Sequence, residues 1–118
     1  MRWNNLNKIL IVEDDLSIHN SLDELLKQEN YITYNAYSGS EALLLLEKNN
    51  FDLILLDLML PGTSGEEIIK RVNDIPIIVL SAKVSCDDKV NCLLSGARDY
   101  ITKPFRNKEL LARIEVQL

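Results

Sequence analysis

The chain has 118 residues, of which 47% are hydrophobic and 26% are charged, and its formal net charge is −5 at pH 7. These values predict one compact soluble domain and exclude a disordered or fibrous chain. The negative charge argues against a broad nucleic-acid-binding surface, which needs clustered lysine and arginine. The sequence shows neither a signal peptide nor an apolar run long enough to span a bilayer, so we expect a cytoplasmic location and no membrane contact.

Five short apolar runs predict strands, and helical patterns alternate with them. The strands are expected at 8–12, 31–36, 51–57, 76–81 and 99–102. The first helix carries Ile18, Leu22, Leu25 and Leu26 on one face, with Asp15 or Ser17 as its N-cap. The other helices are expected at 38–50, 65–73, 85–96 and 107–118.

This order of elements predicts an α/β fold with a parallel sheet. Strands joined by crossover helices run parallel, and a parallel sheet is covered on both faces. This accounts for the middle strands, which are apolar throughout instead of alternating. We expect a doubly wound three-layer sandwich that forms a single domain over residues 1–118, in which residues 1–7, including Trp3, form a loose tail.

Polar side chains follow the ends of several predicted strands. They are Glu13, Asp14 and Asp15 after the first strand, Asp57 at the end of the third, Ser81 at the end of the fourth and Lys103 after the fifth. In an open parallel sheet the carboxyl ends of the strands meet at one edge, where ligands bind. We therefore expect these side chains to form one site.

The chemistry of this group indicates a metal site. Three carboxylates in the first loop would repel a phosphate, and the sequence has no glycine-rich phosphate-binding motif. Carboxylate oxygens without histidine or cysteine suit a hard cation such as magnesium. We expect Asp14 and Asp57 to bind it directly, Glu13 to act through a water molecule, and Lys103 to balance the remaining charge.

Each member of the group also has a simpler interpretation. Asp15 is expected only to stabilise the start of a helix. Asp57 and Ser81 could cap the loops after their strands, and Lys103 could be a surface lysine before a turn. Their convergence at one edge of the sheet favours a common site.

Four segments carry a resemblance to a known family. "KILIVEDD", "DLILLDLMLPGTSG", "PIIVLSA" and "GARDYITKPF" occur in the order and at the approximate spacings of the receiver domain of bacterial two-component response regulators. The resemblance covers almost the entire chain. It implies a flavodoxin-like, CheY-like fold with the strand order 2-1-3-4-5 and five helices.

The resemblance also implies a signalling role rather than that of a conventional enzyme. Asp57 would be the phosphoacceptor for a phosphohistidine on a sensor histidine kinase, with the domain catalysing its own phosphorylation and dephosphorylation. Asp14, Asp57 and the backbone carbonyl of Met59 would bind magnesium, for which manganese can substitute, and Glu13 would hold a water of the ion. Phosphoryl transfer is catalysed mainly by positioning and charge neutralisation, which agrees with this set of residues.

Further site residues follow from the resemblance. Ser81 and Lys103 would each bind a phosphoryl oxygen, and Tyr100 would move inward with Ser81 as the switch aromatic. Tyr100 could instead be an ordinary edge-strand aromatic. Pro104 would follow a cis peptide bond, the one setting in which cis is cheap, and this would aim Lys103 into the site.

The segment "FRNKELLARIEVQL" resembles the OmpR/PhoB branch, whose receivers precede a winged-helix DNA-binding domain. Such an output domain would lie beyond residue 118, and DNA would be bound only through it. The face formed by the fourth helix, fifth strand and fifth helix would form a homodimer after phosphorylation. Asp99 and Arg113 would pair across it and Lys89 would contribute, although Arg98 stands where that branch often has an acid.

Two rival functions share part of this pattern. An aspartyl-phosphate phosphatase usually carries a second acid two residues after its nucleophile, and here that residue is Met59. A pseudo-receiver binds partners without phosphorylation but tends to lack one of the site residues. Because Met59 cannot hydrogen-bond an attacking water, and Lys83 occupies the other position that tunes self-hydrolysis, we expect a long-lived phosphoryl form.

The remaining chemistry-bearing residues are interpreted as structural. His19 is expected at a solvated position on the first helix. Cys86 and Cys92 are six residues apart, so they face different directions on a helix and cannot form a metal pair. Cys92 is expected to be the buried one.

Overall fold

The computed structural model describes residues 6–82 and 86–118. Its strands are β1 (Lys8–Val12), β2 (Ile32–Ala36), β3 (Leu53–Asp57), β4 (Ile77–Ser81) and β5 (Asp99–Thr102). Its helices are α1 (Leu16–Gln28), α2 (Gly39–Lys48), α3 (Gly65–Arg71), α4 (Cys86–Ser95) and α5 (Asn107–Gln117). Every strand lies within its predicted range, and strands and helices alternate as expected.

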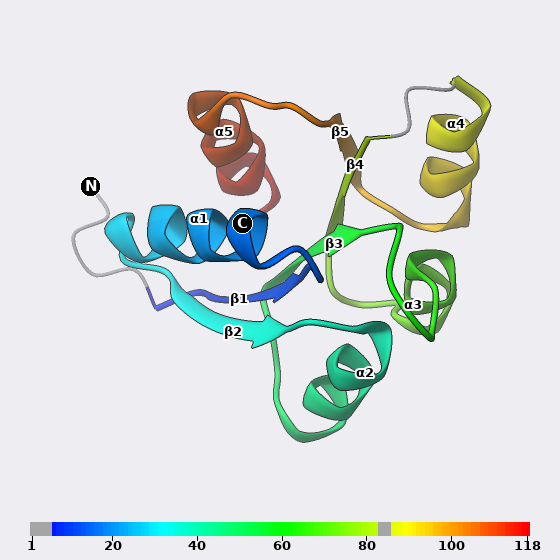
Figure 1. Ribbon diagram of the computed structural model, residues 1–118, viewed down its shortest axis with the longest axis horizontal. Helices are drawn as coiled ribbons and strands as arrows, with labels where there is room; N and C mark the ends of the chain where they lie inside the picture. Colours follow the sequence, from blue (N-terminus) through cyan, green and yellow to red (C-terminus); the bar gives the residue numbers. More distant parts are fainter. Residues whose placement is uncertain (1–5, 83–85) are drawn as a thin grey trace.

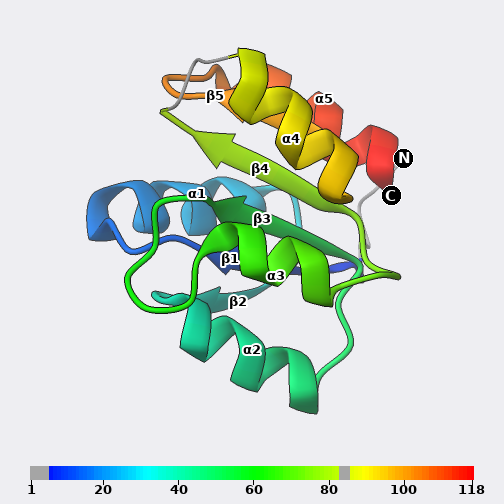
Figure 2. The same cartoon turned by 90° about the vertical axis from the view of Figure 1, so that its right-hand side faces the viewer.

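The strands form one parallel sheet in the order β2-β1-β3-β4-β5, which confirms the predicted doubly wound topology. Figure 1 shows the sheet between two layers of helices. Helices α1 and α5 cover one face, and Figure 2 shows α2, α3 and α4 in front of the other face. The molecule is therefore the expected three-layer sandwich.

A separate apolar core fills each side of the sheet. On one side, Leu22 and Leu26 of α1 and Leu110 and Ile114 of α5 pack against alternate residues of the strands. On the other side, helices α2 to α4 pack against the intervening strand residues. All five residues of β3 and of β4 are buried, as the unbroken apolar runs predicted.

Local contacts fix the segments that leave the site edge of the sheet. Asp15 is the N-cap of α1, because its carboxylate accepts a hydrogen bond from the Ile18 N–H at 3.0 Å. Gly65 opens α3 against the end of β3. A Cβ at this position would lie 2.8 Å from Cα of Leu58 and 2.9 Å from the carbonyl oxygen of Asp57, so only glycine fits.

Asn7, which was expected to belong to a loose tail over residues 1–7, is instead bonded to the sheet. The carbonyl of Asn7 accepts a hydrogen bond from the N–H of Ile32 at 3.0 Å, which ties position 7 to the sheet. Trp3 lies outside the described residues.

Cys92 is buried, as predicted. Within residues 6–82 and 86–118, no helix is long and apolar enough to cross a membrane.

Candidate functional site

The register of the sheet brings the predicted site residues to one edge. Val12 of β1 lies beside Leu56 of β3, so Glu13 and Asp57 follow at the same level. Asp57 in turn lies beside Leu80 of β4, and Ser81 lies beside Thr102 of β5. Lys103 comes next, and its backbone N–H donates to the Ser81 carbonyl at 2.8 Å.

Three carboxylates meet at this edge. One oxygen from each of Glu13, Asp14 and Asp57 lies within 4.8 Å of the other two. Glu13 and Asp57 are buried, with exposed fractions of 2% and 7%, whereas Asp14 is exposed. An all-oxygen donor set with one exposed member is accessible from solvent and matches the preference of magnesium. These residues therefore fit a hard divalent cation.

Lys103 supplies the positive charge of the site. Its Nζ lies 2.7 Å from Oε1 of Glu13 and 3.4 Å from Oδ2 of Asp57, and 16% of its side chain is exposed. Burial works to lower the pKa of Lys103, but the hydrogen bond to Glu13 and the charges of both carboxylates outweigh it and raise the pKa. The ammonium group stays charged between the two acids.

Glu13 titrates differently from an ordinary glutamate. Burial, foremost, and the neighbouring Asp57 raise the pKa of Glu13 above its usual 4.5, while the hydrogen bond from Lys103 lowers it. The backbone N–H of Asp15 also donates to Oε2 of Glu13 at 3.2 Å. The hydrogen bond from Lys103 therefore opposes the effect of burial on the pKa of Glu13.

The other predicted site residues lie close by. The N–H of Met59 donates to Oδ1 of Asp57 at 3.1 Å, which steadies the carboxylate. Ser81 and Tyr100 are both buried, at the end of β4 and within β5. The peptide bond between Lys103 and Pro104 is cis. Lys83 lies outside the described residues.

One expectation about the site is wrong. His19 is not solvated but has no exposed surface. In the described part of the chain the buried polar or charged side chains are Glu13, His19, Asp57 and Ser81. His19 is thus the one of this group that the sequence reasoning missed. Its spacing to Leu22 and Leu26, three and seven residues on, places it on the buried stripe of α1 and could have revealed it.

Two of the residues expected at a dimer face, Asp99 and Arg113, contact each other within one chain. Nη1 of Arg113 lies 3.0 and 2.9 Å from the two carboxylate oxygens of Asp99, and Nη2 lies 3.1 Å from Glu109. Lys89 is exposed on α4. Two apolar side chains of α4, Val90 and Leu94, are 43% and 82% exposed.

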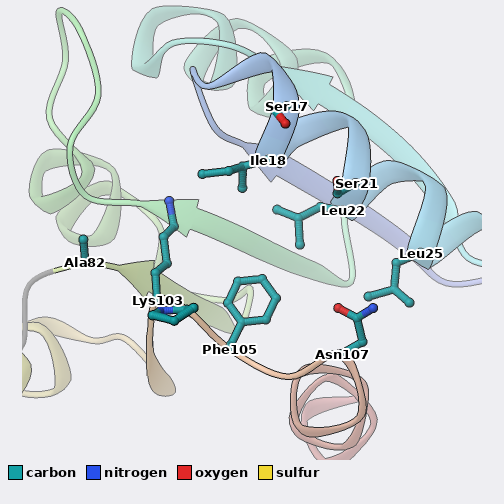
Figure 3. A pocket seen from close by; sticks show the side chains of 10 residues that line it. Ser17, Ile18, Ser21, Leu22, Leu25, Ala82, Lys103, Phe105 and Asn107 are labelled. Carbon is teal, nitrogen blue, oxygen red and sulfur yellow. The ribbon is translucent and has the colours of Figure 1, made fainter.

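A groove opens beside the site between α1 and the segment that follows β5. Its volume is about 570 Å³. Figure 3 shows Ile18, Leu22 and Leu25 of α1 pointing toward Phe105, while the amino group of Lys103 lies near the end of β3. The groove therefore presents an apolar wall that leads to the carboxylates.

Comparisons with known proteins agree on one family. A family model described as response regulator receiver domain matches residues 9–115. The regulatory protein VanR of Enterococcus faecium is 47% identical over 115 residues, which cover 95% of this chain. This chain spans 50% of the length of VanR.

Solved structures give the same result. The receiver domain of Francisella response regulator 1452 superposes with a TM-score of 0.89 at 35% identity, covering 94% of this chain and 95% of that one. A CheY-like receiver domain protein from Methanospirillum hungatei JF-1 gives a TM-score of 0.90 at 32% identity, covering 96% of this chain and 94% of that one.

Proposed function

Because the chain belongs to the response regulator receiver domain family, we propose that Asp57 accepts a phosphoryl group from a phosphohistidine on a sensor histidine kinase. A carboxylate oxygen of Asp57 forms the new bond to phosphorus while the bond from phosphorus to the donor nitrogen breaks. The electron pair of that bond stays on the imidazole, which takes up a proton. The product is an acyl phosphate on the protein.

The observation that carries this proposal is the contact of Asp57 with Lys103 inside a group of acids. The ammonium at 3.4 Å from Asp57 and 2.7 Å from Glu13 balances charge on the nucleophile and is within reach of an incoming phosphoryl oxygen. Ser81, at the end of the neighbouring strand, would donate its hydroxyl to a second oxygen.

Magnesium would be held by Asp14, Asp57 and the Met59 carbonyl, with Glu13 binding one of its waters. When bound, the ion supplies positive charge that neutralises the transferring group. The three carboxylates, one oxygen of each lying within 4.8 Å of the other two, support this assignment. Manganese would substitute, since it accepts the same oxygen ligands.

The kinase would approach over the groove between α1 and Phe105. An apolar wall of Ile18, Leu22 and Leu25 beside a charged site suits the face of an amphipathic partner helix that carries the phosphohistidine. Such a helix would bring the donor nitrogen to Asp57 past Lys103. No part of this step requires a small-molecule substrate.

The output would pass through α4, β5 and α5. Ser81 would follow the phosphoryl group, and Tyr100, already buried, would be held inward. We propose a homodimer through this face, in which Asp99 and Arg113 exchange their contact within the chain for one with a second copy, and Lys89 adds to it. Exposed Leu94 would be covered in that dimer.

Transcriptional regulation would require a domain outside this chain. The 50% coverage of VanR leaves room for one beyond residue 118, and we propose a winged-helix DNA-binding domain of the OmpR/PhoB type there. DNA would be contacted only by that domain, because the receiver carries a net charge of −5. The signalling would take place in the cytoplasm, where histidine kinases present their phosphohistidine.

The test uses acetyl phosphate as donor, with intact mass spectrometry as the readout. The wild-type chain is expected to gain one phosphoryl group in magnesium and none in EDTA. Asp57→Asn should gain none, and the exposed control Asp74→Asn should behave as wild type. Labelling that persists in Asp57→Asn, or that needs no divalent metal, would overturn the proposal.

The same samples separate the two rival functions. A chain that binds magnesium but is never labelled would be a pseudo-receiver. Continuous hydrolysis of a small phosphate ester would indicate a phosphatase. The side chain two residues after the nucleophile is the exposed thioether of Met59, which does not orient an attacking water, so we expect the label to decay slowly after the donor is removed.

A further inference from the structure

We propose that His19 is a positioning residue that holds the loop carrying Glu13 and Asp14 in the geometry needed for magnesium. The inference rests on the proposed function, because it concerns the same metal site. Among the described residues, His19 is the buried polar side chain that the phosphoryl-transfer chemistry leaves without a role.

The imidazole is hydrogen-bonded through both nitrogens. Nδ1 lies 2.8 Å from the backbone carbonyl oxygen of Glu13, and since that oxygen can only accept, Nδ1 donates. Nε2 lies 2.7 Å from Oδ1 of Asn35 on β2. The ring also stacks on Tyr37, with centroids 4.2 Å apart and planes 20° from parallel. The three contacts leave the ring one orientation.

The partner of Nε2 is itself fixed. Asn35 makes a side-chain hydrogen bond to Asp23 of α1, and Asp23 also accepts a hydrogen bond from Oγ1 of Thr33 at 2.6 Å. Asn35 thus contacts Asp23 and His19 at the same time. This chain of contacts ties α1 to β2 and ends at the carbonyl of Glu13.

The contacts of His19 restrain the backbone that leads to Asp14. The N–H of Glu13 donates to the Ala36 carbonyl at 3.1 Å, and His19 binds the carbonyl of Glu13. Both backbone groups of Glu13 are therefore held. The peptide between Glu13 and Asp14 is planar, so fixing its oxygen also fixes the direction in which the Asp14 backbone continues. Asp14 is exposed, so this backbone restraint takes the place of packing around its side chain.

This arrangement resembles the outer-shell contacts that orient metal ligands, which change metal affinity by about 10- to 100-fold when removed. His19 would not touch the ion. Its removal should therefore weaken magnesium binding while leaving the chemistry of a loaded site intact. Weaker magnesium binding together with an unchanged labelling rate at saturating magnesium distinguishes a positioning role from a catalytic role and from a loss of stability.

Three substitutions of His19 each keep a different contact of the imidazole ring. His19→Asn keeps a donor near the position of Nδ1, and His19→Gln keeps one near the position of Nε2. His19→Phe keeps a ring for Tyr37 and loses both hydrogen bonds. Leu26→Ala, in the buried core and seven residues further along the same helix, is the control for lost stability.

Magnesium affinity is measured by isothermal titration calorimetry with magnesium chloride alone, and acetyl phosphate labelling is then followed at increasing magnesium. His19→Phe and His19→Gln should bind magnesium about tenfold more weakly than wild type, whereas His19→Asn should stay close to wild type. At saturating magnesium the labelling rate of all three should return to the wild-type rate. Leu26→Ala should lower the urea midpoint without changing magnesium affinity.

Three results would overturn this inference and leave the proposed function standing. The first is wild-type magnesium affinity in His19→Phe, and the second is equal affinity in His19→Asn and His19→Gln. The third is a labelling rate that stays low at saturating magnesium. A wild-type chain that binds no magnesium would instead overturn the proposed function, and this inference with it.

Discussion

Replacing Lys103 by methionine removes the only cation that contacts the buried acids in the described part of the site. The methionine keeps most of the apolar stem, so packing changes little. Glu13 and Asp57 are then left buried beside each other without a counter-charge. We expect the Lys103→Met variant to be strongly destabilised near neutral pH in the absence of divalent metal.

The magnitude follows from the two distances. At 2.7 and 3.4 Å, the attractions of Nζ to the two carboxylates are about 6 and about 5 kcal/mol at an effective dielectric of about 20. Desolvation of the three groups offsets much of this. Removing one partner of a buried pair costs about 3–5 kcal/mol, and partial exposure of Lys103 favours the lower end.

The loss of folding stability in Lys103→Met should depend on pH in a defined direction. The folded pKa of Lys103 is raised, so its stabilisation is present at neutral pH and is lost only as alkaline pH passes through that pKa. On the acid side, protonation of Glu13 removes a charge that Lys103 balances. The pKa of Glu13 lies above 4.5, mainly through burial, so the penalty in Lys103→Met should shrink as the pH falls toward that value.

Urea unfolding followed by circular dichroism in EDTA measures this loss. Lys48→Met, at an exposed position of α2, is the matched control and should change the free energy of unfolding by less than about 0.5 kcal/mol. Magnesium added to Lys103→Met should restore part of the loss by supplying the missing positive charge. A loss of equal size at neutral and acid pH, or no loss at all, would refute the reasoning.

Two further substitutions test how the edge of the sheet is built. Gly65→Ala should lower the free energy of unfolding by about 1–3 kcal/mol and weaken magnesium binding. The added Cβ would lie 2.8 Å from Cα of Leu58, so it must displace the loop after Asp57. Urea unfolding that is unchanged from wild type would contradict this. Burial works to raise the pKa of Asp23, but hydrogen bonds, first from Thr33, outweigh it and lower the pKa. Asp23→Asn should therefore lose about 1 kcal/mol near neutral pH and progressively less as the pH falls below 3.8, whereas equal losses at both pH values would argue against the contact.

Much of the fold could be predicted from the sequence because local and global signals agree. The unbroken apolar runs of β3 and β4 reflect burial on both faces, which only a covered parallel sheet provides. The helix ends were less certain. Asp15 and Ser17 both fit an N-cap, and only the geometry selects Asp15.

The site residues at the strand ends were predictable for the same reason. Because the strands are parallel, their carboxyl ends lie at one edge of the sheet. Glu13, Asp57 and Ser81 therefore share that edge whatever their side-chain conformations. His19 was missed because a polar residue on a helix is usually solvated. The spacing to Leu22 and Leu26 marks the position as buried, but the partners of the ring, Asn35 and Tyr37, come from another part of the chain and cannot be read from the helix pattern.

The pairing of Arg113 with Asp99 illustrates a different limit. The two residues lie on neighbouring elements, β5 and α5, and the structure joins them within one chain. Family resemblance suggested the same pair across a dimer, and residue identity alone does not distinguish the two. Partly exposed pairs of this kind contribute about 1 kcal/mol or less, so either arrangement is energetically accessible.

The position of the phosphoryl group tests the central claim most directly. An acyl phosphate is reduced by borohydride, and an aspartyl phosphate becomes homoserine, which peptide mass spectrometry can locate. After labelling in magnesium, we predict homoserine at position 57 and at no other acidic residue. Homoserine at Asp14, or labelled protein that yields none, would contradict the assignment of Asp57 as the phosphoacceptor.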